Sequence, residues 1–507
     1  MAWKEQSGKK NPQDRLNFVR FCLLQNRFPL RWWLSYWLLN QFFFRRIYYI
    51  LTYFYLMYPQ VFDRPTPIQS VAKQHSDPES VPPEVDKKLY TLGNRLFLGY
   101  FLVTVVGGAL RKWVFSEGII SNMILLALMV FPFLFLRIRQ AGIQSPFKKY
   151  PVLVALLVVL LYHIINPYQK TFFHGMLGVL VYAPFWVGAF FILSNHHVFK
   201  LSKLKWLFIG IAIVEVMLCF AQYALPPGHF LNKYAVEREA GIAMVGDSVR
   251  VTGTFSFLSG LTAYTVFHVF LCWALLRWKF PPWVFFTFLL AGLILSFMSG
   301  SRSGTLIYLG LTAGILLQEF PPAKLVSFLF RYLLPAVIIF LVIIRLGSGP
   351  VFDSANRAID NFVERTTKLQ ASGEQSRRLT FGLGRFNDLS NFPDPILGIG
   401  AGATYQGATI LFGKSDAVIK FGYYESEFLQ VFLEGGIVML IIRITLIFTL
   451  LKRLGYHWLL KIFLFICMIY AMPIVYNVYN AAFLMMGIVL IDNTAFWKNR
   501  ALNAKLN

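Results

Sequence analysis

Residues 281–300 read PPWVFFTFLLAGLILSFMSG, a run without one charged side chain. About 18 or more consecutive apolar residues are enough for a helix to cross the hydrocarbon core of a bilayer. A second such run, IISNMILLALMVFPFLFL, occupies 119–136, and similar runs recur along most of the chain. The sequence therefore predicts an all-α, polytopic membrane protein.

The composition agrees with this class. Of 507 residues, 57% are hydrophobic and only 14% are charged, whereas soluble domains carry about 25% charged residues. The net charge of +24 raises nucleic acid as a partner, but the lysines and arginines follow a membrane topology, so we expect no nucleic acid. The four cysteines are isolated, which indicates neither a disulfide framework nor a thiolate metal site.

The chain divides into a leader, two groups of spans around a long loop, and a tail. Arg45 and Arg46 interrupt the apolar part of the leader, so we favour helices lying in the interface, with spans within 28–62 as the open alternative. The expected regions are a basic, aromatic-rich cytoplasmic leader and linker at 1–88, spans one to nine at 89–346 with an outer loop at 226–256, a long periplasmic loop at 347–424, spans ten to twelve at 425–493, and a basic cytoplasmic tail at 494–507.

We expect about twelve spans, arranged as a helical bundle with a long extracytoplasmic loop domain. Their predicted ranges are 92–110, 119–136, 150–165, 175–193, 204–225, 257–276, 281–299, 302–318, 325–346, 426–451, 459–475 and 479–492.

The distribution of positive charge sets the orientation. Cytoplasmic loops retain lysine and arginine, and the loops after the second, fourth, sixth and tenth spans carry these residues without any acidic one. The segment 347–424 instead holds eight basic and seven acidic residues, as expected of a small domain on the translocated side. Both termini are therefore predicted in the cytoplasm, and Arg302 on the outer face.

Arg302 lies in SFMSGSRSGTLIYL, residues 296–309, between two apolar runs. An arginine at the end of a membrane helix often only anchors the span in the headgroups. Here the predicted side is the one where positive charge is not expected, the neighbours are serine and glycine, and a helix begins, whose free amides favour an anion. These features predict a phosphate or pyrophosphate site in which the guanidinium makes two parallel hydrogen bonds.

Other basic residues are predicted on the same side. Arg250 precedes the sixth span in GDSVRVTGTFSFLSGLTAY, Arg377 and Arg378 lie in GEQSRRLTFGLGRFNDL of the long loop, and Arg111 and Lys112 end the first span in GGALRKWVF. A single loop arginine is usually only solvated. Several beside apolar spans favour an anionic lipid headgroup or a polyprenyl pyrophosphate as the ligand.

A transfer reaction also needs a base. Glu425 follows two tyrosines at the end of the long loop, where partial burial tunes the pKa of a carboxylate. The alternative is an ordinary carboxylate at a helix N-terminus, which fits Glu427 better. His229 in the outer loop is the reserve base. The histidines lack metal-ligand spacing, apart from the adjacent pair His196 and His197, so we expect no metal and no cofactor.

These motifs, in this order, resemble the O-antigen ligase and Wzy-type polysaccharide polymerase superfamily. The resemblance is carried by VRVTGTFSFLSGLTAY, SGSRSGTLIYLGL, NFPDPILGIGAGATYQG and ESEFLQVFLEGGIVML. It covers roughly 92–492 and leaves the leader outside.

The resemblance implies an inner-membrane glycosyltransferase of the all-helical GT-C type, which takes an undecaprenyl-pyrophosphate-linked glycan at the periplasmic face without metal or nucleotide sugar. The arginines of the family that hold pyrophosphate match Arg250 and Arg302, with Arg378 or Arg377 as the third. Ligases have a His-Asn pair where this chain has Glu425 and Ser426, which favours an exopolysaccharide or O-antigen polymerase over a lipopolysaccharide ligase.

The partners that follow are a lipid-linked oligosaccharide donor, a glycan or lipid acceptor, membrane lipids, and a chain-length regulator or flippase. In this interpretation the long loop covers the site, and Tyr405, Tyr423 and Tyr424 stack on sugar rings. The alternative is a flippase or anion transporter, since twelve spans are also typical of transporters. Transporters usually show two similar halves, and we find no internal repeat.

Overall fold

The computed structural model describes residues 87–115, 119–139, 142–235, 243–245, 248–320, 327, 330–331, 334–371, 393–421, 427–471, 474–475 and 477–506. Nearly all of them belong to one compact unit, residues 65–280 and 284–507, whose fold is given below. Almost the whole predicted leader lies outside the described residues. So do Arg377, Arg378, Tyr423, Tyr424 and Glu425, and the predictions made for them stay predictions.

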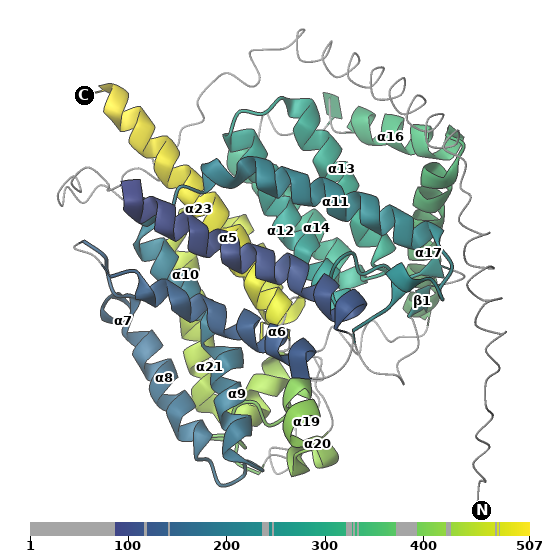
Figure 1. Cartoon of the computed structure of the whole chain (residues 1–507). Helices are drawn as coiled ribbons and strands as arrows, with labels where there is room; N and C mark the ends of the chain where they lie inside the picture. The colour runs from purple at the N-terminus through teal and green to yellow at the C-terminus, as the bar shows by residue number, and fades with distance from the viewer. Residues whose placement is uncertain are drawn as a thin grey trace, which may run out of the picture. The chain divides into compact units, whose positions relative to one another are not determined.

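The described chain is mostly helical, with one pair of two-residue strands (Figure 1). Seven of its helical segments are long and apolar enough to cross a membrane: Tyr90–Val114, Ile120–Arg137, Phe172–Ser194, His196–Ala224, Leu258–Arg277, Glu427–Arg453 and Val478–Ala501. Each matches a predicted span. The coarse prediction of a mostly helical chain, with several helices that could cross a membrane, is therefore confirmed.

The remaining predicted spans are shorter, bent or less apolar, and the predicted eighth span, 302–318, is a helix of 18 residues, Arg302–Glu319, that is not among the seven candidates. Pro151–Ile164, Trp283–Met298 and Trp458–Ile469 are apolar helices of 10–17 residues. The predicted ninth span, 325–346, contains the helix Val337–Leu346, which meets a helix of the predicted long loop, Pro350–Thr367, at an angle of 116°. Counting this pair as one span gives eight candidates in the described part, so the total of twelve stays a prediction.

The elements in chain order have the following bounds: α5 (Lys87–Ala109), η1 (Leu110–Val114), α6 (Ile119–Val130), η2 (Phe131–Arg137), α7 (Pro146–Lys149), α8 (Pro151–Ile164), α9 (Phe172–Tyr182), α10 (Pro184–Ser194), η3 (His196–Val198), η4 (Leu201–Leu204), α11 (Lys205–Ala224), η5 (Phe230–Asn232), β1 (Met244–Val245), β2 (Ser248–Val249), α12 (Leu258–Arg277), α13 (Pro282–Met298), α14 (Arg302–Glu319), α16 (Leu334–Leu346), α17 (Pro350–Ala371), α19 (Gln406–Phe412), α20 (Asp416–Phe421), α21 (Glu427–Arg453), α22 (Trp458–Ile466), η9 (Cys467–Ala471) and α23 (Val478–Leu506).

The centre of the fold is the pair α12 and α23, which lie side by side (Figure 1). Almost every side chain of α12 is buried, as expected of a helix that is apolar all round. Phe483 of α23 packs its ring against Tyr264 and Phe267 of α12. At Gly487 a Cβ atom would lie 2.3 Å from the Phe270 ring, so the glycine is what allows the two helices to approach this closely.

A second group of helices consists of α8, α9 and α21, with α19 packed on α9 (Figure 1). The sequence predicts an unbroken span at 426–451, but α21 is interrupted at Gly436, whose backbone is non-helical (φ 60, ψ −165). Apolar runs lie on both sides of the sequence Glu434-Gly435-Gly436, and the predicted span passed over this interruption, although glycine is a common site of helix kinks. The segment 395–400 packs into this break.

Backbone hydrogen bonds join this segment to the two halves of α21. The amides of Ile399 and Gly400 donate to the carbonyls of Leu433 and Glu434 at 3.0 and 2.8 Å, and the Ile437 amide donates to the Pro395 carbonyl at 2.9 Å. Peptide groups inside an apolar protein must find partners. The inserted segment therefore supplies the partners that the broken helix lacks.

The predicted long loop contains regular structure. Its first part is α17, a helix of 22 residues, and its last part holds the short helices α19 and α20. Residues 372–392 lie outside the described part. The mixed charge of this segment thus belongs in part to a helix that follows α16 at a sharp bend.

Candidate functional site

The segment 299–302 joins α13 to α14 and positions Arg302 as the first residue of α14. Gly300 has φ +64, a conformation that glycine adopts without strain. The Ser301 hydroxyl accepts a hydrogen bond from the Gly304 amide at 3.2 Å and so caps the helix, a bond worth about 1 kcal/mol. The local sequence SGSRSG therefore makes a sharp turn and a capped helix start with an arginine on it.

Arg302 itself is half-buried. Within the part of the chain that the structure describes, its guanidinium forms no hydrogen bond and no ion pair. A guanidinium carries five N–H donors in one plane, and the start of α14 adds the positive end of the helix dipole. This arrangement favours an anionic ligand.

Two further arginines reach the same segment from distant parts of the chain. The Arg250 Nε donates to the Ser299 carbonyl at 2.9 Å. Arg365, on α17, donates from a terminal nitrogen to the Gly300 carbonyl at 2.8 Å. We call Arg250, Arg302 and Arg365 the arginine cluster. The structure thus brings together the two arginines that the sequence placed first, Arg250 and Arg302, and adds one that the sequence did not indicate.

The backbone at Arg250 is held by a tyrosine. Tyr234 donates its hydroxyl to the Arg250 carbonyl at 2.7 Å. Burial raises the pKa of the Tyr234 phenol to about 12, so the phenol remains a donor at neutral pH. Sequence reasoning did not single out Tyr234, because nothing in the outer loop marks one tyrosine as the partner of a carbonyl 16 residues away.

Buried polar side chains hold the turn that follows Arg250 in place. The Lys112 ammonium donates to the Thr252 hydroxyl at 2.7 Å and to the Gly253 carbonyl at 2.8 Å. Glu215 of α11 accepts from the Thr254 amide at 3.1 Å and from its hydroxyl. Gln222 accepts from the Gly253 amide at 2.9 Å. These contacts give the 252–254 turn a single shape.

Lys112 and Arg111, which the sequence proposed as additional ligands, have different positions. Lys112 is only 1% exposed and is committed to the turn, so its place is structural. Arg111 is half-buried and donates to the hydroxyls of Ser121 and Ser256 at 3.1 and 3.2 Å. Ser256 in turn donates to the Tyr479 hydroxyl at 3.2 Å. Arg111 therefore ties α6 and α23 to the far end of the same loop.

The remaining candidates lie elsewhere. His229, the reserve base, caps the short helix η5 by accepting from the Leu231 amide at 3.3 Å. Tyr405 is buried, 7% exposed, so its ring is covered and offers no open face for a sugar. Among the described residues no group of three histidine, cysteine or acidic side chains could hold a metal ion.

The break in α21 is a second polar site, where the charged group is buried and bonded to donors of the protein itself. Glu434 is fully buried and accepts from the Tyr182 hydroxyl at 2.8 Å, from the Gly402 amide at 2.9 Å, and from the Thr404 amide and hydroxyl at 2.8 and 2.6 Å. Hydrogen bonds of this number and length satisfy a buried carboxylate. Glu434 therefore anchors the glycine-rich loop, GIGAGAT, to the end of the first half of α21.

The ion pair between Glu427 and Arg443 shows how sharply α21 turns. The two side chains are in direct contact, although sixteen residues of straight helix would separate them by about 24 Å. The bend at Gly436 makes the contact possible. Because Glu427 is buried and paired, it is committed to the fold, whereas Glu425 lies two residues before α21 and outside the described residues.

Comparison of the chain with protein-family models, with curated proteins and with solved structures finds no match. The arginine cluster and the sequence motifs around it are therefore the features of the chain that bear on its function.

Proposed function

We propose that the chain is a bacterial inner-membrane glycosyltransferase that polymerises or ligates oligosaccharides carried on undecaprenyl pyrophosphate. The observation that carries the proposal is the arginine cluster at 299–302. Arg302 starts a helix without a partner among the described residues, and two further guanidinium groups are anchored on the adjacent carbonyls. Pyrophosphate is a ligand for which several arginines and a helix N-terminus are suited.

In this proposal the donor's anomeric carbon loses its bond to a pyrophosphate oxygen as an acceptor hydroxyl attacks from the opposite face. A new glycosidic bond forms, the anomeric centre inverts, and polyprenyl pyrophosphate leaves with the bonding electron pair. Negative charge grows on the leaving oxygen in the transition state, where a fixed guanidinium stabilises it most. Arg302 has this role, and Arg250 and Arg365 bind the second phosphate and orient the first.

The hydroxyl proton goes to a carboxylate, for which Glu425 is our candidate. The buried pairing of Glu427 with Arg443 and the saturated hydrogen bonding of Glu434 commit those two carboxylates to the fold. Glu425 is the remaining acidic residue of the motif ESEFLQVFLEGGIVML, and we propose it as the base for this reason.

The test is a transfer assay with the purified full chain in detergent or nanodiscs. A lipid-linked oligosaccharide is supplied as donor and acceptor, and products are analysed by mass spectrometry. We expect glycans longer by whole repeat units, with one polyprenyl pyrophosphate released for each new bond. Donor that stays intact in the presence of active, folded protein contradicts the proposal.

The second candidate is a flippase or anion transporter, favoured by the broken helix α21, since discontinuous helices are typical of transporters. In this chain, however, backbone groups of the 395–400 segment are bonded to both ends of the break. The peptide groups at the break therefore have the protein itself as their partner, and not a transported substrate. Reconstituted vesicles separate the two functions. Movement of labelled donor across the bilayer without new glycosidic bonds supports transport, and new bonds support the transferase.

A further inference from the structure

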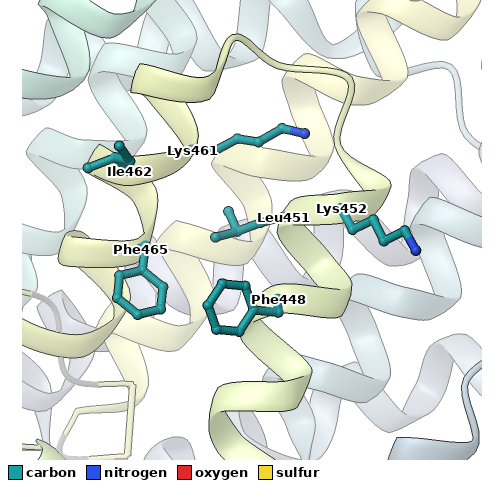
Figure 2. A pocket seen from close by; sticks show the side chains of 6 residues that line it. All are labelled: Phe448, Leu451, Lys452, Lys461, Ile462 and Phe465. Atoms are coloured by element: carbon teal, nitrogen blue, oxygen red, sulfur yellow. The ribbon is translucent and has the colours of Figure 1, made fainter.

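A groove of about 410 Å³ lies between α21 and α22, and none of its lining residues belongs to the arginine cluster. It is lined by Phe448, Leu451, Lys452, Lys461, Ile462 and Phe465. Figure 2 shows the two phenylalanine rings at one end, and the two lysines nearer the connection between the helices. The groove is therefore divided into an apolar part and a cationic part.

The apolar part is shaped by aromatic side chains that face outward. The rings of Phe448 and Phe465 lie 5.5 Å apart, centre to centre. Phe448 is 58% exposed and Ile462 is 44% exposed, although both belong to apolar helices. In a membrane protein such surfaces face acyl chains, which removes the cost of exposing them to water.

The cationic part is formed by Lys452 in the last turn of α21 and Lys461 in α22. Within the described chain, neither ammonium group forms a hydrogen bond or an ion pair. Lys452 is exposed and Lys461 is half-buried. Lysines at the end of a membrane helix commonly extend toward the headgroups, and here two from different helices share one groove with an apolar floor.

We propose that this groove is a binding site for an anionic phospholipid of the surrounding bilayer, with its phosphate between Lys452 and Lys461 and an acyl chain along Phe448 and Phe465. A zwitterionic headgroup brings its own cation to the two lysines, so the site selects against it. The loop between α21 and α22 is predicted on the cytoplasmic side, where anionic lipid is attracted by basic residues near the surface. The proposal is independent of the glycosyltransferase activity.

The experiment uses the full chain in nanodiscs that contain phosphatidylcholine and a photoactivatable phosphatidylglycerol. After irradiation, the labelled peptides are mapped by mass spectrometry. We expect labelling within 448–465, and competition by unlabelled phosphatidylglycerol but not by phosphatidylcholine. The variant K452Q/K461Q lacks both lysines, and we expect its labelling to be lower than that of the wild-type chain by about fivefold or more for each of the two charges lost.

Two variants serve as controls. K452R/K461R keeps both charges and is expected to retain labelling. K148Q/K279Q removes two exposed lysines from other loops predicted on the same side and is expected to leave labelling within 448–465 unchanged. Equal competition by the two lipids, or unchanged labelling in K452Q/K461Q, overturns the proposal. An equal loss of labelling in K148Q/K279Q also overturns the proposal, because the loss would then depend on the total positive charge of the protein and not on the two lysines of the groove.

Discussion

The arginine cluster and the break in α21 both place charged groups inside an apolar protein, but they treat the charge differently. At the break, Glu434 is surrounded by donors from Tyr182, Gly402 and Thr404. At the start of α14, Arg302 has no such partner in the described chain. We infer that Glu434 holds the fold together, and that Arg302 is kept available for a ligand.

The largest effect is expected for Glu434→Ala. The substitution leaves the donors of Tyr182, Gly402 and Thr404 without an acceptor in a dry interior, at a cost on the order of 3–5 kcal/mol. We expect aggregation or a lower midpoint of thermal unfolding, measured by fluorescence-detected size-exclusion chromatography after heating. A variant as stable as the wild-type chain would show that the glycine-rich loop has another anchor.

The next effect is expected for Arg302→Ala, and it concerns activity alone. Removing a group that stabilises charge in the transition state lowers kcat by about 100- to 1,000-fold, while the thermal midpoint stays unchanged because Arg302 makes no bond to the described fold. The transfer assay and the heating assay measure the two quantities. Arg357→Ala is the matched control, since Arg357 is exposed on α17 and is expected to keep full activity.

A smaller loss is expected for Arg365→Ala. Its bond to the Gly300 carbonyl links α17 to the arginine cluster, so both an anion-binding charge and a positioning contact disappear. We expect about a tenfold lower kcat/KM, with Arg365→Lys recovering part of it. If Arg365→Ala and Arg357→Ala behave alike, Arg365 does not belong to the site.

The smallest effect is expected for Tyr234→Phe, which removes one hydrogen bond to the Arg250 carbonyl. A bond of this kind contributes about 1 kcal/mol, so kcat/KM should fall several-fold. Because the pKa of the phenol is raised to about 12, Tyr234 remains protonated, and its bond intact, above the ordinary tyrosine pKa of about 10. The ratio of wild-type to variant rates should therefore be equal at about pH 7 and about pH 10.5, and a ratio that changes between these values would contradict this assignment.

Hydropathy predicted the positions of the membrane helices well, because burial in lipid or in the protein leaves an apolar run in either case. It did not predict the break at Gly436, because hydropathy averaged over a whole span passes over Glu434 and Gly435. The break also depends on a segment about 40 residues earlier in the chain. Nor could it distinguish short apolar helices from full spans, which leaves the number of spans open.

The site was predicted only in part. Charge distribution placed Arg250 and Arg302 on one side of the membrane, and the structure brings both to the 299–302 segment. Arg365 was missed because it lies on an amphipathic helix with acidic neighbours, where a solvated arginine is the ordinary expectation. Lys112 was predicted near the ligand because spacing does not reveal burial, and its two bonds to the 252–254 turn explain its position instead.

The central claim, that the arginine cluster binds the pyrophosphate of the donor, is tested most directly by product inhibition. The inhibition constants of polyprenyl pyrophosphate and polyprenyl monophosphate are measured for the wild-type chain, and binding of both ligands is measured for Arg302→Ala. We predict that the wild-type chain binds pyrophosphate more tightly than monophosphate, and that Arg302→Ala loses about tenfold or more of the affinity for pyrophosphate. Equal affinities of the two chains for pyrophosphate would contradict the account.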